Sequence, residues 1–196
     1  MIVDKLFKNI FYSFLAVGIL WLVYFIDMVF PGSFNEHGIV PRTREGFWGI
    51  FFAPFLHANF QHLLSNSGPL LVLTFVLLVF YENLAFQVWT TSIFLGGFLV
   101  WIFGREATHI GASGLIFSLI GFLLGSGLFR GSFKSLFIAV AIFFLYGGIL
   151  WGVLPNQEGV SWEGHLFGAI AGVILARYYR NVPETLRRRD NHDSFM

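Results

Sequence analysis

Six apolar segments, each close to the length that crosses a lipid bilayer, constrain the fold of this chain more than any other feature. They cover residues 9–30, 60–81, 85–104, 112–129, 133–153 and 162–179. A transmembrane helix needs about 20 consecutive apolar residues. The small residues and the proline inside these segments are tolerated in a packed membrane bundle. The sequence therefore predicts an all-α integral membrane protein built as a bundle of six transmembrane helices.

The composition agrees with this prediction and excludes several other classes of protein. Of the 196 residues, 56% are hydrophobic and 12% are charged, and the formal net charge is +1. A soluble domain is roughly a quarter charged, and a nucleic-acid-binding protein needs a basic face. The sequence contains no cysteine, which excludes disulfides, thiolate metal sites and cysteine nucleophiles.

We expect a single membrane domain over residues 1–180, followed by a short polar cytoplasmic tail over 181–196. The connection over 31–58 is long, and its apolar, aromatic stretch at 46–52 is too short to span a membrane. Such a stretch is typical of a segment that lies in the headgroup region. The other connections are short, as between neighbouring antiparallel helices.

Lysine and arginine residues are distributed unequally between the two sides of the six predicted spans. Because cytoplasmic loops carry an excess of these residues, the richer side, which holds both termini, is predicted to be cytoplasmic. The second, fourth and sixth spans then run from the outside inwards. The richer side has nine (Lys5, Lys8, Arg130, Lys134, Arg177, Arg180, Arg187, Arg188 and Arg189), and the other has three (Arg42, Arg44 and Arg105).

Strongly polar residues within these spans are few, and they lie at the start of the second, fourth and sixth spans. A polar group inside a membrane is costly, so each one is a candidate functional residue. With the predicted orientation, all three clusters lie at one depth, just below the outer surface. The clusters are His57, His62, Ser65 and Asn66; His109 and Ser113; and Glu163 and His165.

Ser113 and His165 have the chemistry of a nucleophile and its base. Ser113 lies among small residues at a helix N-terminus, where free backbone N–H groups and the helix dipole favour a developing oxyanion. A serine needs a base to act as a nucleophile, and His165 lies at a similar depth on the sixth span. Glycines on the fourth and sixth spans allow close packing, so we predict a Ser–His dyad. These glycines are Gly114, Gly121, Gly125, Gly164, Gly168 and Gly172.

The remaining polar residues have alternative interpretations. His62 and Asn66 share one helix face and can each donate to an oxyanion, but they also suit interhelical hydrogen bonding. His109 is a rival base, although it lies in a loop. Glu163 is interpreted as a hydrated residue at the interface, and His57 as a residue that orients the junction between loop and helix.

Three ordered blocks resemble the rhomboid family of intramembrane serine proteases. Residues 57–66 match HxxxxHxxxN, residues 111–114 match GxSG, and Gly164-His165 with Gly168 matches the block of the catalytic histidine. The resemblance covers residues 31–179. It implies the six-helix rhomboid core of bacterial type, with the first loop lying at the membrane interface.

The resemblance also implies roles for individual residues. Ser113 corresponds to the nucleophile and His165 to the general base, and the family cleaves membrane-anchored proteins near the outer face without metal or nucleotide cofactors. A bacterial inner membrane, with the active site toward the outer side, is the expected location, and the oligomeric state stays open. The implied oxyanion hole is His62, Asn66 and the Ser113 backbone N–H, with His57, Gly111, Gly114, Gly168 and Phe117 as supporting residues.

The sequence departs from the family pattern at two positions. Trp48-Gly49 stands where many members have Trp-Arg, so hydrogen bonds from that arginine are absent from the first loop. Phe117 stands where several members have a tyrosine beneath the histidine; it can stack but cannot donate a hydrogen bond.

A catalytically silent, rhomboid-like protein that binds or chaperones membrane helices is the alternative function. A small transporter fits less well, because the polar groups lie at one end of the spans and no inverted repeat is visible.

Overall fold

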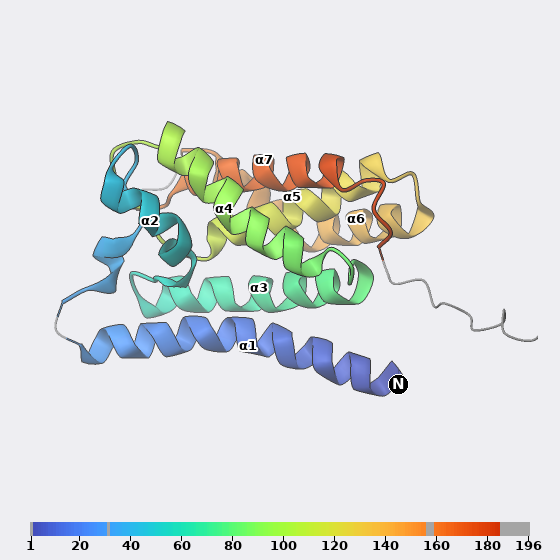
Figure 1. The fold of residues 1–196 in the computed structure, drawn as a ribbon, viewed down its shortest axis with the longest axis horizontal. Helices are drawn as coiled ribbons and strands as arrows, with labels where there is room; N and C mark the ends of the chain where they lie inside the picture. Colours follow the sequence, from blue (N-terminus) through green and yellow to red (C-terminus); the bar gives the residue numbers. More distant parts are fainter. Residues whose placement is uncertain (1, 31, 156–158, 185–196) are drawn as a thin grey trace, which may run out of the picture.

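The computed structural model describes residues 2–30, 32–155 and 159–184, and helices form most of this part of the chain. The long first connection also pairs with the loop between the fourth and fifth α-helices: Ile39 forms an isolated antiparallel bridge with His109. Figure 1 shows the long helices lying side by side along one axis. The elements are α1 (Ile2–Val29), η1 (Phe34–His37), α2 (Arg44–Phe52), η2 (Ala53–Phe55), α3 (Phe60–Phe80), α4 (Ala85–Phe103), α5 (Ser113–Phe129), α6 (Phe133–Tyr146), η3 (Gly147–Val153) and α7 (Trp162–Tyr178), where η marks a 3-10 helix.

Four of the described segments are long and apolar enough to cross a membrane: Val3–Val29, Phe60–Phe80, Ala85–Phe103 and Phe133–Val153. Helices α5 and α7 have 17 residues each, about 25 Å at 1.5 Å per residue. Together these six segments form a multi-pass, all-helical membrane bundle, and the fold class predicted from the sequence is confirmed. The bounds match the prediction closely at α3, α4, α5 and α7.

Two bounds differ from the sequence-based ones. Helix α1 starts at Ile2 instead of 9, because its polar first turns continue the helix beyond the apolar stretch. The fifth predicted span is helical throughout, but it changes from an α-helix to a 3-10 helix at Gly147. The apolar, aromatic stretch at 46–52 lies within the short helix α2.

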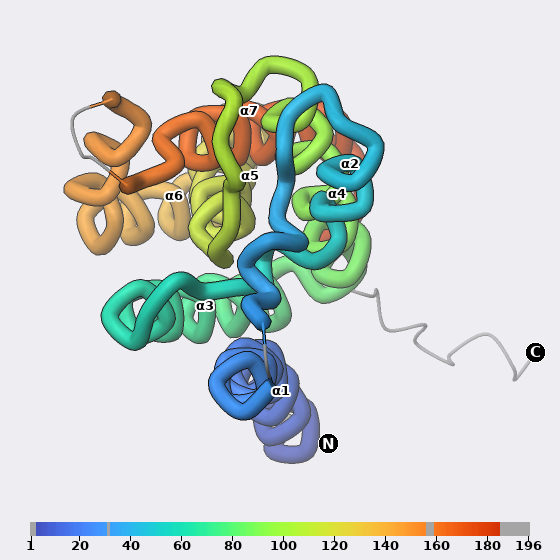
Figure 2. Tube along the Cα trace, turned by 90° about the vertical axis from the view of Figure 1, so that its left-hand side faces the viewer, coloured from blue at the N-terminus to red at the C-terminus, as the bar shows by residue number. Residues whose placement is uncertain are grey.

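Helix α5 occupies the centre of the bundle, and Figure 2 shows it between α7, α6, α4 and α3, with α1 at the periphery. Close contact between α5 and α7 requires small residues. A Cβ atom built at Gly168 would lie 2.2 Å from the Gly114 carbonyl oxygen, and one at Gly172 would lie 2.0 Å from the Ser118 carbonyl oxygen. The two backbones therefore touch at these positions, which fixes the separation of the helices.

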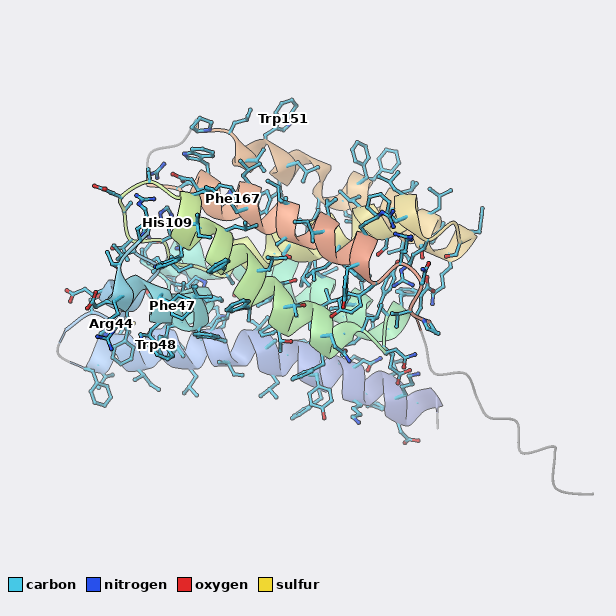
Figure 3. The ribbon with its side chains drawn as sticks, turned by 45° about the horizontal axis from the view of Figure 1, so that its top comes forward. Arg44, Phe47, Trp48, His109, Trp151 and Phe167 are labelled. Carbon is cyan, nitrogen blue, oxygen red and sulfur yellow. The ribbon has the colours of Figure 1, made fainter. Side chains whose placement is uncertain are left out.

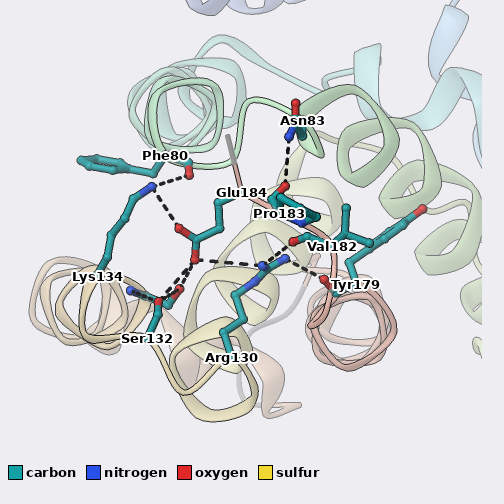
Figure 4. A network of polar contacts seen from close by, with 10 residues as sticks. Phe80, Asn83, Arg130, Ser132, Lys134, Tyr179, Val182, Pro183 and Glu184 are labelled. Atoms are coloured by element: carbon teal, nitrogen blue, oxygen red, sulfur yellow. Dashed lines mark hydrogen bonds and ion pairs between the residues drawn. The ribbon is translucent and has the colours of Figure 1, made fainter. Parts of the chain in front are cut away.

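The end of the bundle that holds the N-terminus carries a polar network around Glu184, shown in Figure 4. Burial opposes ionisation of Glu184, but a hydrogen bond from Ser135 at 2.5 Å and contacts with Lys134 at 3.0 Å outweigh it and lower the pKa of this carboxyl. Arg130 donates to the backbone carbonyls of Val182 and Tyr179, each at 2.8 Å.

Residues 181–184, which the sequence assigned to the tail, are therefore bonded to the ends of α5 and α6. The rest of the predicted tail, 185–196, including Arg187, Arg188 and Arg189, lies outside the described residues.

Candidate active site

A cavity of about 810 Å³ opens at the end of the bundle where α3, α5 and α7 begin. Ser113 from α5, His165 from α7, and His62 and Asn66 from α3 all line this cavity, together with Phe117. The fold thus brings the three polar clusters of the sequence to one place. They converge because all three helices start at the same end of the bundle.

Ser113 is the first residue of α5, and the preceding N-cap residue, Ala112, supplies no side-chain cap. The first amide of α5 paired within the helix is that of Ile116, which donates to the Ala112 carbonyl at 2.9 Å. The amides of the first turn have no intrahelical acceptor. Free N–H groups at a helix N-terminus favour an anion. Four other α-helices of the described chain have side-chain caps, from Thr43, Asn59, Ser132 and Ser161.

The imidazole of His165 is held on two sides. Its ring stacks on Phe117, with centroids 4.2 Å apart and planes 5° from parallel. Its Nδ1 lies 2.8 Å from the carbonyl oxygen of Gly152 in η3. Because a carbonyl oxygen only accepts, Nδ1 carries the hydrogen, and Nε2 is the unprotonated nitrogen of the neutral ring.

No direct hydrogen bond joins Ser113 to His165 among the contacts of the described residues. Both side chains nevertheless line the same cavity. Hydrogen bonds between catalytic groups are often long before substrate binds, and they shorten in the reactive complex. The side chains of Ser113 and His165 therefore face a common space without a direct hydrogen bond between them.

His62 and Asn66 lie beside the loop that precedes Ser113. A Cβ atom built at Gly111 would lie 2.5 Å from His62 Nε2 and 3.6 Å from Asn66 Nδ2. Gly111 has a φ angle of 108°, which a side chain would strain. Asn66 is buried, and its Nδ2 has no hydrogen-bond partner. A buried donor without an acceptor is costly, so the site holds a hydrogen-bond donor ready for an incoming acceptor.

The Rhomboid domain family model matches residues 44–182, which include every one of these cavity residues. The chain belongs to the rhomboid family. This confirms the resemblance drawn from the three sequence blocks.

Several curated proteins are similar to this rhomboid. An uncharacterized protein of Mycobacterium tuberculosis is 43% identical over 183 residues, covering 88% of this chain and 75% of its own. RHOMBOID-like protein 1 of Arabidopsis thaliana is 28% identical and covers 70% of this chain and 36% of its own length. The chloroplastic Rhomboid-like protein 11 of the same plant is 28% identical and covers 89% and 70%, respectively.

The first loop of this rhomboid is fixed without the arginine found in many members. A Cβ atom built at Gly49 would lie 2.1 Å from the Gly38 carbonyl oxygen, so α2 contacts the preceding chain by its backbone. Arg42 donates to the carbonyls of Ile102 at 3.2 Å and Gly104 at 2.8 Å. Glycine at 49 is therefore required by close packing, and other contacts hold the loop. Figure 3 shows α2, with Phe47 and Trp48, at the same end of the bundle as His109.

His109, the rival base, has both ring nitrogens in use. Nε2 lies 3.1 Å from the Arg105 carbonyl and therefore donates, and Nδ1 accepts from the Ser161 hydroxyl at 2.7 Å. Burial lowers the pKa of His109, which favours this neutral form. Ser161 in turn caps α7 by accepting from the Gly164 amide at 3.1 Å. His109 thus joins the loop before Ser113 to the start of the helix that carries His165.

Ser161 was missed by the sequence reasoning, although a serine just before an apolar run is a common N-cap signal. The interpretation of Glu163 as a hydrated residue was wrong. Its side chain is 2% exposed, and its carboxylate lies 3.3 Å from Arg105 Nη1. A buried carboxylate needs such a partner.

His57 lies behind His62, outside the cavity lining. Their ring centroids are 5.0 Å apart, and His57 Nδ1 lies 3.3 Å from the Phe55 carbonyl, to which it donates. Burial, and secondly the ring of His62, lower the pKa of His57 to about 4. A neutral His57 therefore packs at the junction between the loop and α3.

Proposed function

We propose that this protein is an intramembrane serine endopeptidase, as some members of its family are. The observation that carries the proposal is the convergence of Ser113, His165, His62 and Asn66, from three helices, on one cavity. The unprotonated Nε2 of His165 would supply the base for acyl transfer, and the Ser113 hydroxyl at the start of α5 the nucleophile. The uncapped amides of α5 and the unpaired Asn66 donor would supply the oxyanion site.

In the proposed reaction, His165 Nε2 takes the proton of the Ser113 hydroxyl while Oγ attacks the scissile carbonyl carbon. The carbonyl oxygen becomes an oxyanion that accepts hydrogen bonds from Asn66, from His62 and from the Ser113 amide. His165 then gives its proton to the leaving amine, and an acyl-enzyme remains. His165 then takes a proton from a water molecule that attacks the acyl carbonyl carbon, and it returns this proton to Ser113 Oγ as the bond between Oγ and the acyl carbon breaks.

The proposed substrates are membrane-anchored proteins with a transmembrane helix. A helix hides its carbonyls in internal hydrogen bonds, so the substrate must unwind locally before Ser113 attacks. The excess of lysine and arginine at the opposite end supports cytoplasmic termini and a cavity that opens toward the outer side. We further propose a bacterial inner membrane as the location, and residues 1–180 as the catalytic domain.

A serine-reactive fluorophosphonate probe and a model single-span substrate in liposomes test the proposal together. Wild-type protein should label and cleave, and Ser113→Ala should do neither. Ser126→Ala on the same helix is the control, because Ser126 is buried far along α5 from the cavity and its loss should leave both readouts intact. A wild-type protein that binds the substrate helix without cleaving or labelling would instead identify a silent binder and overturn the proposal.

A further inference from the structure

We infer that the backbone carbonyl of Gly152 serves as the third member of the catalytic group, by holding His165 in its reactive tautomer. The inference rests on the proposed function, because it assigns a positioning role in that reaction. In the Ser–His–Asp sites of soluble proteases, a buried carboxylate accepts from Nδ1 and presents Nε2 to the serine. Here Gly152 in η3 takes the place of that carboxylate.

The neighbouring carboxylate does not occupy this place. Glu163 is two residues before His165, but its carboxylate faces Arg105 at 3.3 Å. The Nδ1 contact with the Gly152 oxygen, at 2.8 Å, has the length of a good hydrogen bond. Stacking on Phe117 fixes the plane of the ring, and this hydrogen bond fixes its rotation within that plane.

A side chain at residue 152 would crowd the imidazole that the carbonyl of this residue holds. A Cβ atom built there would lie 3.0 Å from His165 Nδ1 and 3.2 Å from Phe117 Cζ. Gly148, in the same 3-10 helix, has nothing within 4 Å of its built Cβ. Gly152 and Gly148 of η3 thus differ sharply in what a methyl group would meet.

The element that supplies this carbonyl also reaches the cavity. Helix η3 has seven residues, whereas 3-10 segments longer than three or four residues are uncommon. Residues three apart lie on the same face of a 3-10 helix, so Ile149 and Gly152 share one face. Ile149 lines the cavity. A substrate that presses on Ile149 therefore acts on the turn that orients the base.

The tautomer of His165 in the resting protein gives the first test, independent of activity. In protein labelled with ¹⁵N-histidine, the ring-nitrogen resonances that disappear in the His165→Asn variant belong to His165. In the wild type at neutral pH, these resonances should show a protonated Nδ1 and an unprotonated Nε2. A protonated Nε2 in the wild type would overturn the inference, whether or not the protein cleaves substrate.

Replacement of Val153 by its α-hydroxy analogue gives the second test, since it converts the Gly152 carbonyl into an ester carbonyl, a weaker acceptor. Losing most of one hydrogen bond should lower kcat by about 3- to 10-fold, with KM nearly unchanged, and should increase the Nε2-protonated fraction of His165. The same replacement at Leu150 is the control, because it also removes one amide of η3 but leaves the Gly152 carbonyl intact. Equal effects at both positions would contradict the inference.

The glycine pair gives the third test. Gly152→Ala should slow both fluorophosphonate labelling of Ser113 and cleavage by about 3- to 10-fold, because the His165 and Phe117 rings must each move by a few tenths of an ångström, a fraction of the 1 Å misplacement that costs about 10²-fold. Gly148→Ala should change neither by more than about 2-fold, since its methyl group meets open space. If wild type itself is not labelled, the proposed function fails, while the tautomer measurement still decides the role of Gly152.

Discussion

Replacing Gly168 by alanine should separate helices α5 and α7 by a distance that the structure sets. The added Cβ would lie 2.2 Å from the Gly114 carbonyl oxygen, whereas ordinary contacts begin at 3.4 Å. Since the obstacle is backbone, no rotamer change relieves it, and α7 must move from α5 by about 1.2 Å at this point. Gly168 lies less than one turn from His165, so the base moves with it.

We expect this displacement to lower kcat by about 10²-fold, the usual cost of a 1 Å misplacement in a catalytic group. Overpacking should lower the free energy of unfolding by about 1–3 kcal/mol, and the higher helix propensity of alanine should offset up to about 1 kcal/mol of this loss. Gly172→Ala should have a similar effect on stability, because its Cβ would lie 2.0 Å from the Ser118 carbonyl oxygen. The effect of Gly172→Ala on kcat should be smaller, because residue 172 lies about 10 Å along the helix from His165.

Cleavage kinetics and thermal unfolding in detergent measure both effects. Gly18→Ala is the control, because a Cβ at this position in α1 meets nothing within 4 Å. Full activity and an unchanged melting temperature in Gly168→Ala would show that the contact between α5 and α7 does not set the geometry of the dyad. A loss of kcat in Gly172→Ala as large as that in Gly168→Ala would show that general loosening, and not local displacement of His165, is responsible.

Three further predictions concern the oxyanion site, pH dependence and the opposite end of the bundle. Asn66→Ala should slow cleavage by about 10²–10³-fold without abolishing it, and an unchanged rate would exclude Asn66 from the oxyanion hole. Because burial lowers the pKa of His57 to about 4, the folded state binds fewer protons than the unfolded state between pH 6.5 and about 4. The stability that depends on a neutral His57 is therefore complete above pH 6.5. It decreases as the pH is lowered from 6.5 to about 4, by up to about 1.4 kcal/mol for each pH unit. His57→Gln should flatten this decline in thermal unfolding measured from pH 7 to 4.5, and an identical decline would assign it to other groups. Glu184→Gln should lower the stability by about 1 kcal/mol through loss of its ion pair with Lys134, and fluorophosphonate labelling should stay at the wild-type rate; slower labelling would show that this end is coupled to the cavity.

The positions of the spans and of the candidate site residues were readable in the sequence for a physical reason. A bilayer requires long apolar segments, so hydropathy locates helices such as α3 and α4 to within one residue. The same requirement makes polar residues rare, so those that remain are informative. Ser113 and His165 were singled out in this way, and the structure places both at one cavity.

Gly49 shows where this reading fails. In the sequence, Gly49 stands where many family members have an arginine, and the hydrogen bonds of that arginine are therefore absent. In the structure, Gly49 allows α2 to pack closely against the Gly38 carbonyl oxygen, and Arg42 supplies hydrogen bonds that hold the loop. A glycine required by packing and one that replaces a functional side chain look alike until the neighbouring backbone is known.

The sequence by itself determined that this chain crosses a membrane several times, that it belongs with the rhomboids, and which polar residues share one depth. Only the tertiary structure decided the partners of those residues: Glu163 with Arg105, His109 with Ser161, and His165 with Gly152. The reason is the range of the interactions. Hydropathy is a property of consecutive residues, whereas a hydrogen bond to a backbone carbonyl depends on which turn of chain lies opposite. Every residue carries such a carbonyl, so no residue type marks the one that orients the base.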